Sequence, residues 1–183
     1  MGLACGRRHY RAAGCASGVY QHHLAAVVGS VVVTEIARSC LLLVPVSRAY
    51  EVVANIQRYP EFLPSCEAVS VLQRRQISAT VEEVAAQVTV SKAGVTYQFE
   101  TLNTGTADQT IEVALQSGPF ERLQGEWRFK ALGEEGCRVE LQLDFVASGL
   151  LARLIEPIAQ RAADRMVDAF AQRIGTQAVS CDA

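Results

Sequence analysis

Residues 123–130 read LQGEWRFK, an apolar and a polar side chain in strict alternation, and this stretch decides the fold. Successive side chains of a strand point to opposite faces, so the alternation predicts a strand with one apolar and one solvated face. The same period recurs in three other runs, 95–100 (VTYQFE), 110–116 (TIEVALQ) and 138–145 (RVELQLDF). Short glycine-bearing joints at 117–119 and 133–136 predict antiparallel hairpins. The result is a sheet whose wide apolar face needs a cover.

A long amphipathic segment after Ala147 supplies that cover. Its apolar residues recur at spacings of three and four from Leu150 to Ile174, with charged and amide side chains on the other side. Pro157 lies inside the segment and cannot donate a backbone hydrogen bond, which predicts a kink or two helices that meet there. We therefore expect an α+β fold, with a curved antiparallel sheet wrapped on a C-terminal helix.

The elements before these runs are less regular. Ser47 is the expected N-cap of a short helix, which must end before Pro60 because the residue preceding a proline avoids the helical region. The apolar parity changes near Glu82, which predicts a bulge or a register adjustment at residues 82–83. The remaining predicted elements are a strand at 35–44, the helix from 47 to 56, strands at 66–76 and 78–90, and a turn at 91–94.

The start of the chain differs in composition from the rest. The predicted organisation is a leader at 1–33, one domain at 34–176 and a disordered tail at 177–183. The leader is rich in arginine and histidine and has no acidic residue. Three interpretations stay open: a mitochondrial-type targeting segment, a secretory signal without a convincing cleavage site, and a misplaced start, which we favour.

Charge and cysteine usage narrow the class of protein. The leader holds three of the 17 basic residues and none of the 19 acidic ones, so the rest of the chain carries a charge near −5. That is a poor balance for binding DNA or another phosphate backbone, which needs a basic surface. A basic patch that gathers Arg48, Arg58, Arg74 and Arg75 in three dimensions would change this. The six cysteines show no metal-ligand spacing, which indicates buried thiols in a reducing compartment.

The residues available for catalysis are few. All three histidines lie in the leader, so no Ser-His-Asp triad, Cys-His pair or histidine metal site is expected in the domain. The strand carboxylates alternate with apolar residues and therefore belong to the solvent face. These are Glu112, Glu126, Glu140 and Asp144. The sequence thus predicts no catalytic residue, no metal ligand and no catalytic cofactor.

The apolar interior remains as the candidate site. The inner face of the sheet is predicted to carry Tyr97, Phe99, Trp127, Phe129 and Phe145, and the helix is predicted to add Leu154, Ile158, Met166 and Phe170. Two alternatives stay open, because such residues either pack as a solid core or line a cavity. Gly125 leaves space on the inner face and favours the cavity.

One segment makes the chain resemble a known family. Residues 59–66, YPEFLPSC, resemble the Tyr-Pro-x-Phe-Leu-Pro-x-Cys signature of the coenzyme Q-binding proteins in the START-like, polyketide cyclase/dehydrase superfamily, whose bacterial members include ribosome association toxins (RatA). Further matches in the family's order are Val90 to Gly94, Gly118 to Phe120, Leu123, Gly125, Trp127, Phe129, Cys137, Leu143, Phe145, Met166, Ala169 and Phe170. The resemblance covers residues 34–176.

The resemblance implies a helix-grip fold of six to seven strands around the C-terminal helix, enclosing a hydrophobic tunnel. It implies two functions: ubiquinone binding in support of respiration, as in mitochondrial relatives, and binding of the large ribosomal subunit to block subunit joining, as reported for bacterial ones. Residues 59–66 would form the mouth, where Phe62 and Leu63 either gate the tunnel or plug the core. Lys92 is either a polar contact for the quinone or an ordinary turn lysine.

The quinone function fits the residues better, because burying a polyprenyl tail contributes about 0.8 kcal/mol per methylene without any ionisable group. We therefore expect non-catalytic binding of ubiquinone or a related prenyl lipid, with ribosome association as the alternative. The expected location is the bacterial cytoplasm, with transient contact at the inner membrane surface as an open option, or the mitochondrial inner membrane in a eukaryote.

Overall fold

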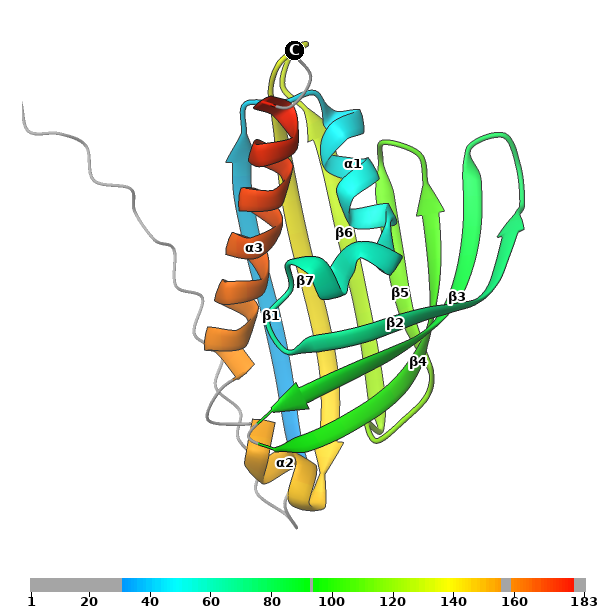
Figure 1. Ribbon diagram of the computed structural model, residues 1–183, viewed down its shortest axis with the longest axis vertical. Helices are drawn as coiled ribbons and strands as arrows, with labels where there is room; N and C mark the ends of the chain where they lie inside the picture. Colours follow the sequence, from blue (N-terminus) through cyan, green and yellow to red (C-terminus); the bar gives the residue numbers. More distant parts are fainter. Residues whose placement is uncertain (1–30, 93, 156–158, 180–183) are drawn as a thin grey trace, which may run out of the picture.

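Seven strands form one antiparallel sheet in a computed structural model that describes residues 31–92, 94–155 and 159–179 (Figure 1). The order across the sheet is β1-β7-β6-β5-β4-β3-β2. The elements are β1 (Val31–Leu42), α1 (Val46–Ala54), the 3-10 helix η1 (Ile56–Glu61), β2 (Cys66–Gln76), β3 (Val81–Lys92), β4 (Val95–Thr106), β5 (Thr110–Ser117), β6 (Arg122–Ala131), β7 (Cys137–Ser148), α2 (Gly149–Ile155) and α3 (Ala159–Val179).

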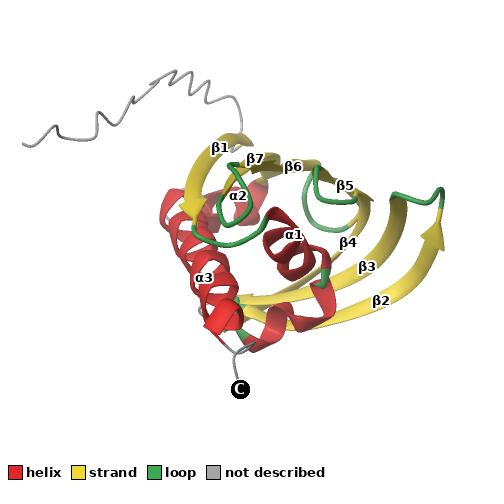
Figure 2. Cartoon of the chain, turned by 90° about the horizontal axis from the view of Figure 1, so that it is seen from above, coloured by secondary structure: helices red, strands yellow, loops and turns green. Residues whose placement is uncertain are grey.

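The sheet curls around its helices. Seen from above, α3 lies between the two edge strands β1 and β2, and α1 lies within the concave side (Figure 2). One buried cluster joins Val53 of α1, Trp127 of β6 and Phe170 of α3. The predicted α+β architecture of a curved antiparallel sheet on a C-terminal helix is therefore confirmed.

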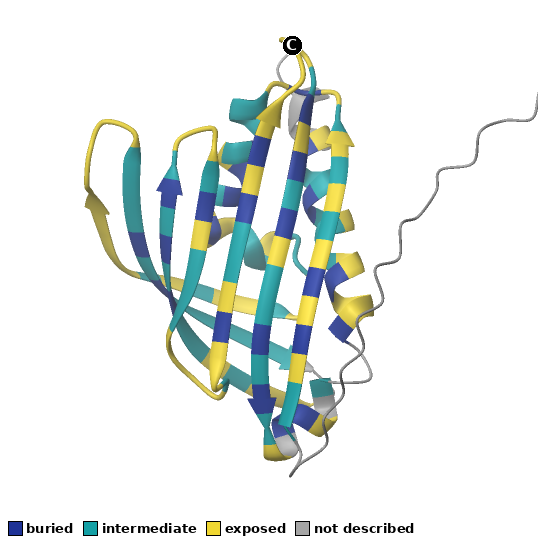
Figure 3. Cartoon of the chain, turned by 180° about the vertical axis from the view of Figure 1, so that it is seen from behind, coloured by how far each residue is buried: buried dark blue, intermediate teal, exposed yellow. Residues whose placement is uncertain are grey.

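The apolar residues of the alternating runs are mostly buried or half-buried in the structure, and the polar residues between them are mostly exposed. Along β6, Trp127 and Phe129 are buried whereas Arg128 and Lys130 are exposed, and β7 shows the same pattern (Figure 3). Because Trp127 is paired with Leu141 across the ladder, the apolar residues of the two strands share one face.

Several boundaries differ from the predicted ones. The first strand begins at Val31 and ends at Leu42, and β3 begins at Val81. Ser78 does not start β3 because its hydroxyl accepts hydrogen bonds from the N–H groups of Thr80 and Val81 in the preceding turn. At the other end α3 runs to Val179, so residues 177–179 are helical and not part of a disordered tail.

Two local predictions are wrong. The N-cap of α1 is Pro45 and not Ser47, and no side chain caps this helix. Pro45 has the extended backbone of an N-cap residue, with φ −56° and ψ 146°, and its carbonyl oxygen accepts hydrogen bonds from the N–H groups of Arg48 and Ala49. The expected bulge at 82–83 is absent, since β3 pairs with β4 without a register shift. The irregularities lie instead in β2, an edge strand with two register shifts, and in β5, where one extra residue lies opposite Glu100 and Thr101.

The predicted interruption near Pro157 falls on residues outside the described ranges. On either side of it the structure has two separate helices, α2 ending at Ile155 and α3 beginning at Ala159.

Candidate functional site

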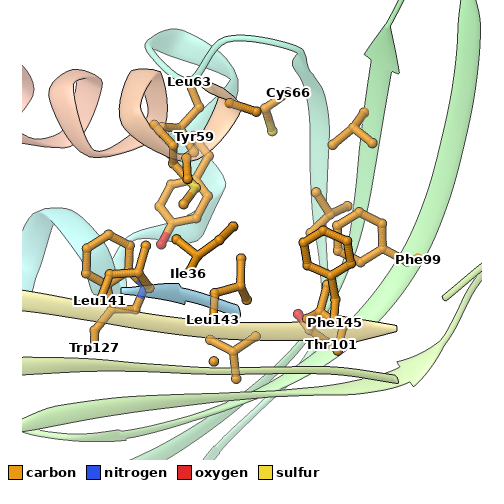
Figure 4. A pocket seen from close by; sticks show the side chains of 18 of the residues that line it. Ile36, Tyr59, Leu63, Cys66, Phe99, Thr101, Trp127, Leu141, Leu143 and Phe145 are labelled. Carbon is orange, nitrogen blue, oxygen red and sulfur yellow. The ribbon is translucent and has the colours of Figure 1, made fainter. Parts of the chain in front are cut away.

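A cavity of about 380 Å³ lies between the concave face of the sheet, the 59–66 segment and α3 (Figure 4). Its volume falls within the range of about 300–1,000 Å³ that is usual for small-molecule sites. Two of its lining residues, Pro64 and Ala162, are exposed. The cavity therefore reaches the surface at Pro64 of the 59–66 segment and at Ala162 in the first turn of α3.

The structure brings six of the residues predicted for the site to this cavity. They are Leu63, Phe99, Trp127, Phe145, Met166 and Phe170. Trp127 and Phe145 project from adjacent strands of the sheet, whereas Met166 and Phe170 lie one helical turn apart on α3. Of the two alternatives, a solid core or a cavity, the structure therefore shows the cavity.

Three predicted lining residues lie elsewhere. The ring of Phe62 packs against Tyr59 and Phe170, with the guanidinium of Arg173 5.5 Å from its centre. Tyr97 packs in a separate cluster with Ala147 and Leu151, because the start of β4 lies beside α2. Phe129 lies edge-on to Tyr50 of α1, which covers that end of β6.

The remaining predicted residues cannot be placed at the cavity. The side chains of Lys92 and Leu154, and the whole of Ile158, fall outside the described residues. The possible polar contact from Lys92 to a quinone stays a prediction.

Three polar residues of the lining were not among the predicted lining residues: Tyr59, which belongs to the segment predicted as the mouth, Thr101 and Asn103. A signal for the last two exists in the sequence. Continuing the alternation of 95–100 by two steps places Thr101 and Asn103 on the same face as Phe99, and β4 does extend to Thr106. Tyr59 carries no such signal, because its position depends on how η1 packs against α3.

The ionisable groups of the lining are neutral. The Tyr59 hydroxyl donates a hydrogen bond to the carbonyl oxygen of Val53 at 2.6 Å, and burial raises the pKa of Tyr59. Burial also raises the pKa of the Cys66 thiol. Among the described residues that line the cavity there is no aspartate, glutamate, lysine, arginine or histidine. The four strand carboxylates predicted for the solvent face are all outside this lining.

The 59–66 segment is held against α3 by an ion pair and by edge-on contacts between aromatic rings. Glu61 accepts hydrogen bonds from Arg58 at 3.0 Å and from Arg173 at 2.6 Å. The hydrogen bond from Arg58, together with the charge of Arg173, holds the pKa of Glu61 below its ordinary value. The ring of Tyr59 lies 5.1 Å from that of Phe170. These contacts hold the 59–66 segment, which forms one wall of the cavity, against α3 at Phe170 and Arg173.

The arginines named as a possible basic patch are paired with acids. Arg74 and Arg75 bridge to Glu82 and Glu83 across the β2–β3 ladder, and Arg58 bridges to Glu61. Arg48 lies 3.5 Å from Glu51. This pairing reduces the positive potential that a phosphate backbone would meet.

Two other features are absent from the described part of the chain. None of its helices is long and apolar enough to cross a membrane. No group of three or more histidine, cysteine or acidic side chains is placed to hold a metal ion within those ranges.

Comparison with known proteins gives the relatives of this chain. A family model described as polyketide cyclase / dehydrase and lipid transport matches residues 42–171. The ribosome association toxin RatA of Pseudomonas aeruginosa is 40% identical over 141 residues, which are 76% of this chain and 94% of that protein.

Two solved structures show the same fold at low sequence identity. The Zhui aromatase/cyclase of Streptomyces sp. R1128 has a TM-score of 0.71 at 17% identity, over 82% of this chain and 98% of the enzyme. A START superfamily protein of Mycobacterium smegmatis has a TM-score of 0.66 at 16% identity, over 78% of this chain and 98% of that one.

Proposed function

This chain belongs to the polyketide cyclase/dehydrase and lipid transport family, which the resemblance of its 59–66 segment predicted, and from that premise we propose that it is a non-catalytic binding protein for a neutral, largely apolar molecule. Ubiquinone or a related polyprenyl lipid is the ligand that we propose. The protein would act as a carrier that supports respiratory electron transport.

The observation that carries the proposal is a cavity lined by aromatic and aliphatic side chains without a charged group among its described residues. Acid–base catalysis needs a positioned titratable group with a pKa near the working pH. Tyr59 and Cys66 have pKa values raised above their ordinary values, which moves them further from that range. The lining therefore supports binding better than the catalysis of the aromatase/cyclase relative.

The size of the cavity suggests how a long lipid would be held. A volume of about 380 Å³ suits a quinone ring with the first isoprene units, and the rest of the tail would leave between Pro64 and Ala162. Each isoprene unit buries five carbons, a gross gain of about 4 kcal/mol. A few buried units are therefore sufficient for binding.

The test is a titration of the full-length protein with a short-chain ubiquinone, followed through tryptophan emission. Trp127 is the single tryptophan and lines the cavity, so its emission should fall in a saturable way as the quinone binds. Native mass spectrometry, with organic extraction of protein from a quinone-containing host, should show a stoichiometric prenyl lipid. A folded protein that is purified without a lipid and rejects added quinone would contradict the proposal.

Ribosome association is a second candidate, favoured by the 40% identity to a ribosome association toxin over nearly all of that protein. In this function the protein would bind the large ribosomal subunit in the cytoplasm and block its joining with the small one. Arg74 and Arg75 are suitable for a test of ribosome contact by substitution, because both arginines are exposed on an edge strand.

Overexpression followed by sedimentation of ribosomes tests this candidate. We expect the wild type to shift joined ribosomes toward free subunits, and reversal of charge at both Arg74 and Arg75 to weaken the shift. A matched reversal at Arg128, which pairs with Glu126 on the outer face of β6, serves as the control. An unchanged profile on overexpression of the folded wild type would remove the ribosome candidate and leave the quinone proposal untouched.

A further inference from the structure

Two polar residues stand side by side in the apolar wall of the cavity. Thr101 and Asn103 occupy successive inward positions of β4, and their side chains are only 4% and 9% exposed. Asn103 faces Val113 across the ladder, Val113 faces Gly125, and Gly125 faces Leu143. The row that begins at Asn103 is therefore otherwise apolar.

The polar atoms of this pair have no hydrogen-bond partner among the residues that the structure describes. Within the described ranges neither side chain makes a hydrogen bond, and no side-chain nitrogen or oxygen that is sealed from solvent lacks a partner there. The hydroxyl of Thr101 and the amide of Asn103 therefore face the open space of the cavity, where Figure 4 shows the Thr101 oxygen.

A ligand that fills the cavity removes the solvent from these atoms. Leaving a buried amide or hydroxyl without a hydrogen bond costs about 1–3 kcal/mol, so a purely hydrocarbon ligand is penalised. A charged head group is penalised more strongly, because the described lining offers no opposite charge to it. The groups that satisfy both conditions are neutral oxygens: a carbonyl, a hydroxyl or an ether.

We propose that Thr101 and Asn103 form the head-group site of the cavity and select ligands that carry a neutral oxygen against both hydrocarbons and ionised lipids. This head-group site rests on the proposed binding function and adds to it the orientation of the ligand, whose head enters the cavity first. The oxygen-bearing head lies against β4, and the apolar remainder extends toward the opening beside Pro64 and Ala162.

Three isoprenoids of one chain length test the selectivity: farnesol, farnesoic acid and the hydrocarbon farnesene. Each displaces 1-aminoanthracene, an uncharged fluorophore, from the full-length protein at a pH where the acid is ionised. The wild type should bind farnesol about tenfold more tightly than farnesene, the equivalent of one net hydrogen bond, and farnesoic acid most weakly.

The near-isosteric change Asn103→Leu should weaken farnesol binding about tenfold and strengthen farnesene binding, since it removes the polar group that the hydrocarbon leaves unpaired. Thr101→Val should act in the same direction. Thr104→Val is the matched control, because residue 104 is paired with Glu83 and Glu112 on the outer face of the same strand. The melting temperatures of the ligand-free variants should equal or exceed that of the wild type.

The outcomes separate the two proposals. If farnesol and farnesene bind the wild type equally, or if Asn103→Leu and Thr101→Val leave their ratio unchanged, the head-group site is overturned while the binding function stands. If none of the three isoprenoids nor the quinone binds, both proposals fall.

Discussion

Replacing Phe170 with alanine is expected to lower the free energy of unfolding by about 3–5 kcal/mol, the usual cost of truncating a buried aromatic side chain. Its ring is 3% exposed and lies edge-on to three other rings, those of Trp127, Tyr59 and Phe62, at centroid distances of 4.9, 5.1 and 5.2 Å. It thus joins α3 to the sheet and to the 59–66 segment. For a domain of this size the loss corresponds to a fall in melting temperature of about 6–20 °C.

Urea unfolding followed by circular dichroism measures this loss. The control is Leu43→Ala, because Leu43 is 94% exposed and its truncation should change stability by no more than about 0.5 kcal/mol. A loss at Phe170 as small as the loss at Leu43 would show that α3 is not held by this aromatic cluster.

Filling the cavity from β5 is expected to weaken quinone binding at least about tenfold. Val113 points into the cavity beside Gly125, and a Cβ built at Gly125 would lie 3.7 Å from the Cβ of Val113. In Val113→Phe the new ring therefore occupies part of the cavity that Val113 lines. A tenfold change equals about 1.4 kcal/mol, which lies within the cost of about 1–3 kcal/mol of forcing extra atoms into a filled interior.

Phenylalanine is chosen because Trp127 then remains the single tryptophan, and the same emission titration measures binding in both proteins. Glu112→Phe is the matched control, since it adds the same ring one residue away on the exposed face of β5. Equal binding by Val113→Phe and the wild type, with both folded, would place the ligand outside this cavity.

The strands and the helical stripe were readable from the sequence because their signals are local. Alternation places Phe99, Trp127 and Phe145 on one face whatever the strands pair with, and the three-and-four spacing does the same for Met166 and Phe170. These five residues do line the cavity. Extending the same rule by two inward positions would have found Thr101 and Asn103 as well.

Other features depend on the packing of distant segments. The pairing of β1 with β7 joins residues such as Ile36 and Leu143, which are remote in sequence, and nothing local specifies this partner. Phe129 and Tyr97 have the correct parity for the inner face, yet α1 and α2 cover those ends of their strands. Parity selects a face of the sheet, whereas the position along the strand selects what covers it.

The sequence by itself determined the fold class, the inward face and the absence of histidine from the domain, because periodicity and composition are properties of the chain. Only the tertiary structure decided that the interior is hollow, that Tyr59 lines it and that the amide of Asn103 faces open space. The physical reason is that a cavity is the difference between the volume that curved sheet and helices enclose and the volume that their side chains fill. Neither quantity exists until the elements have packed.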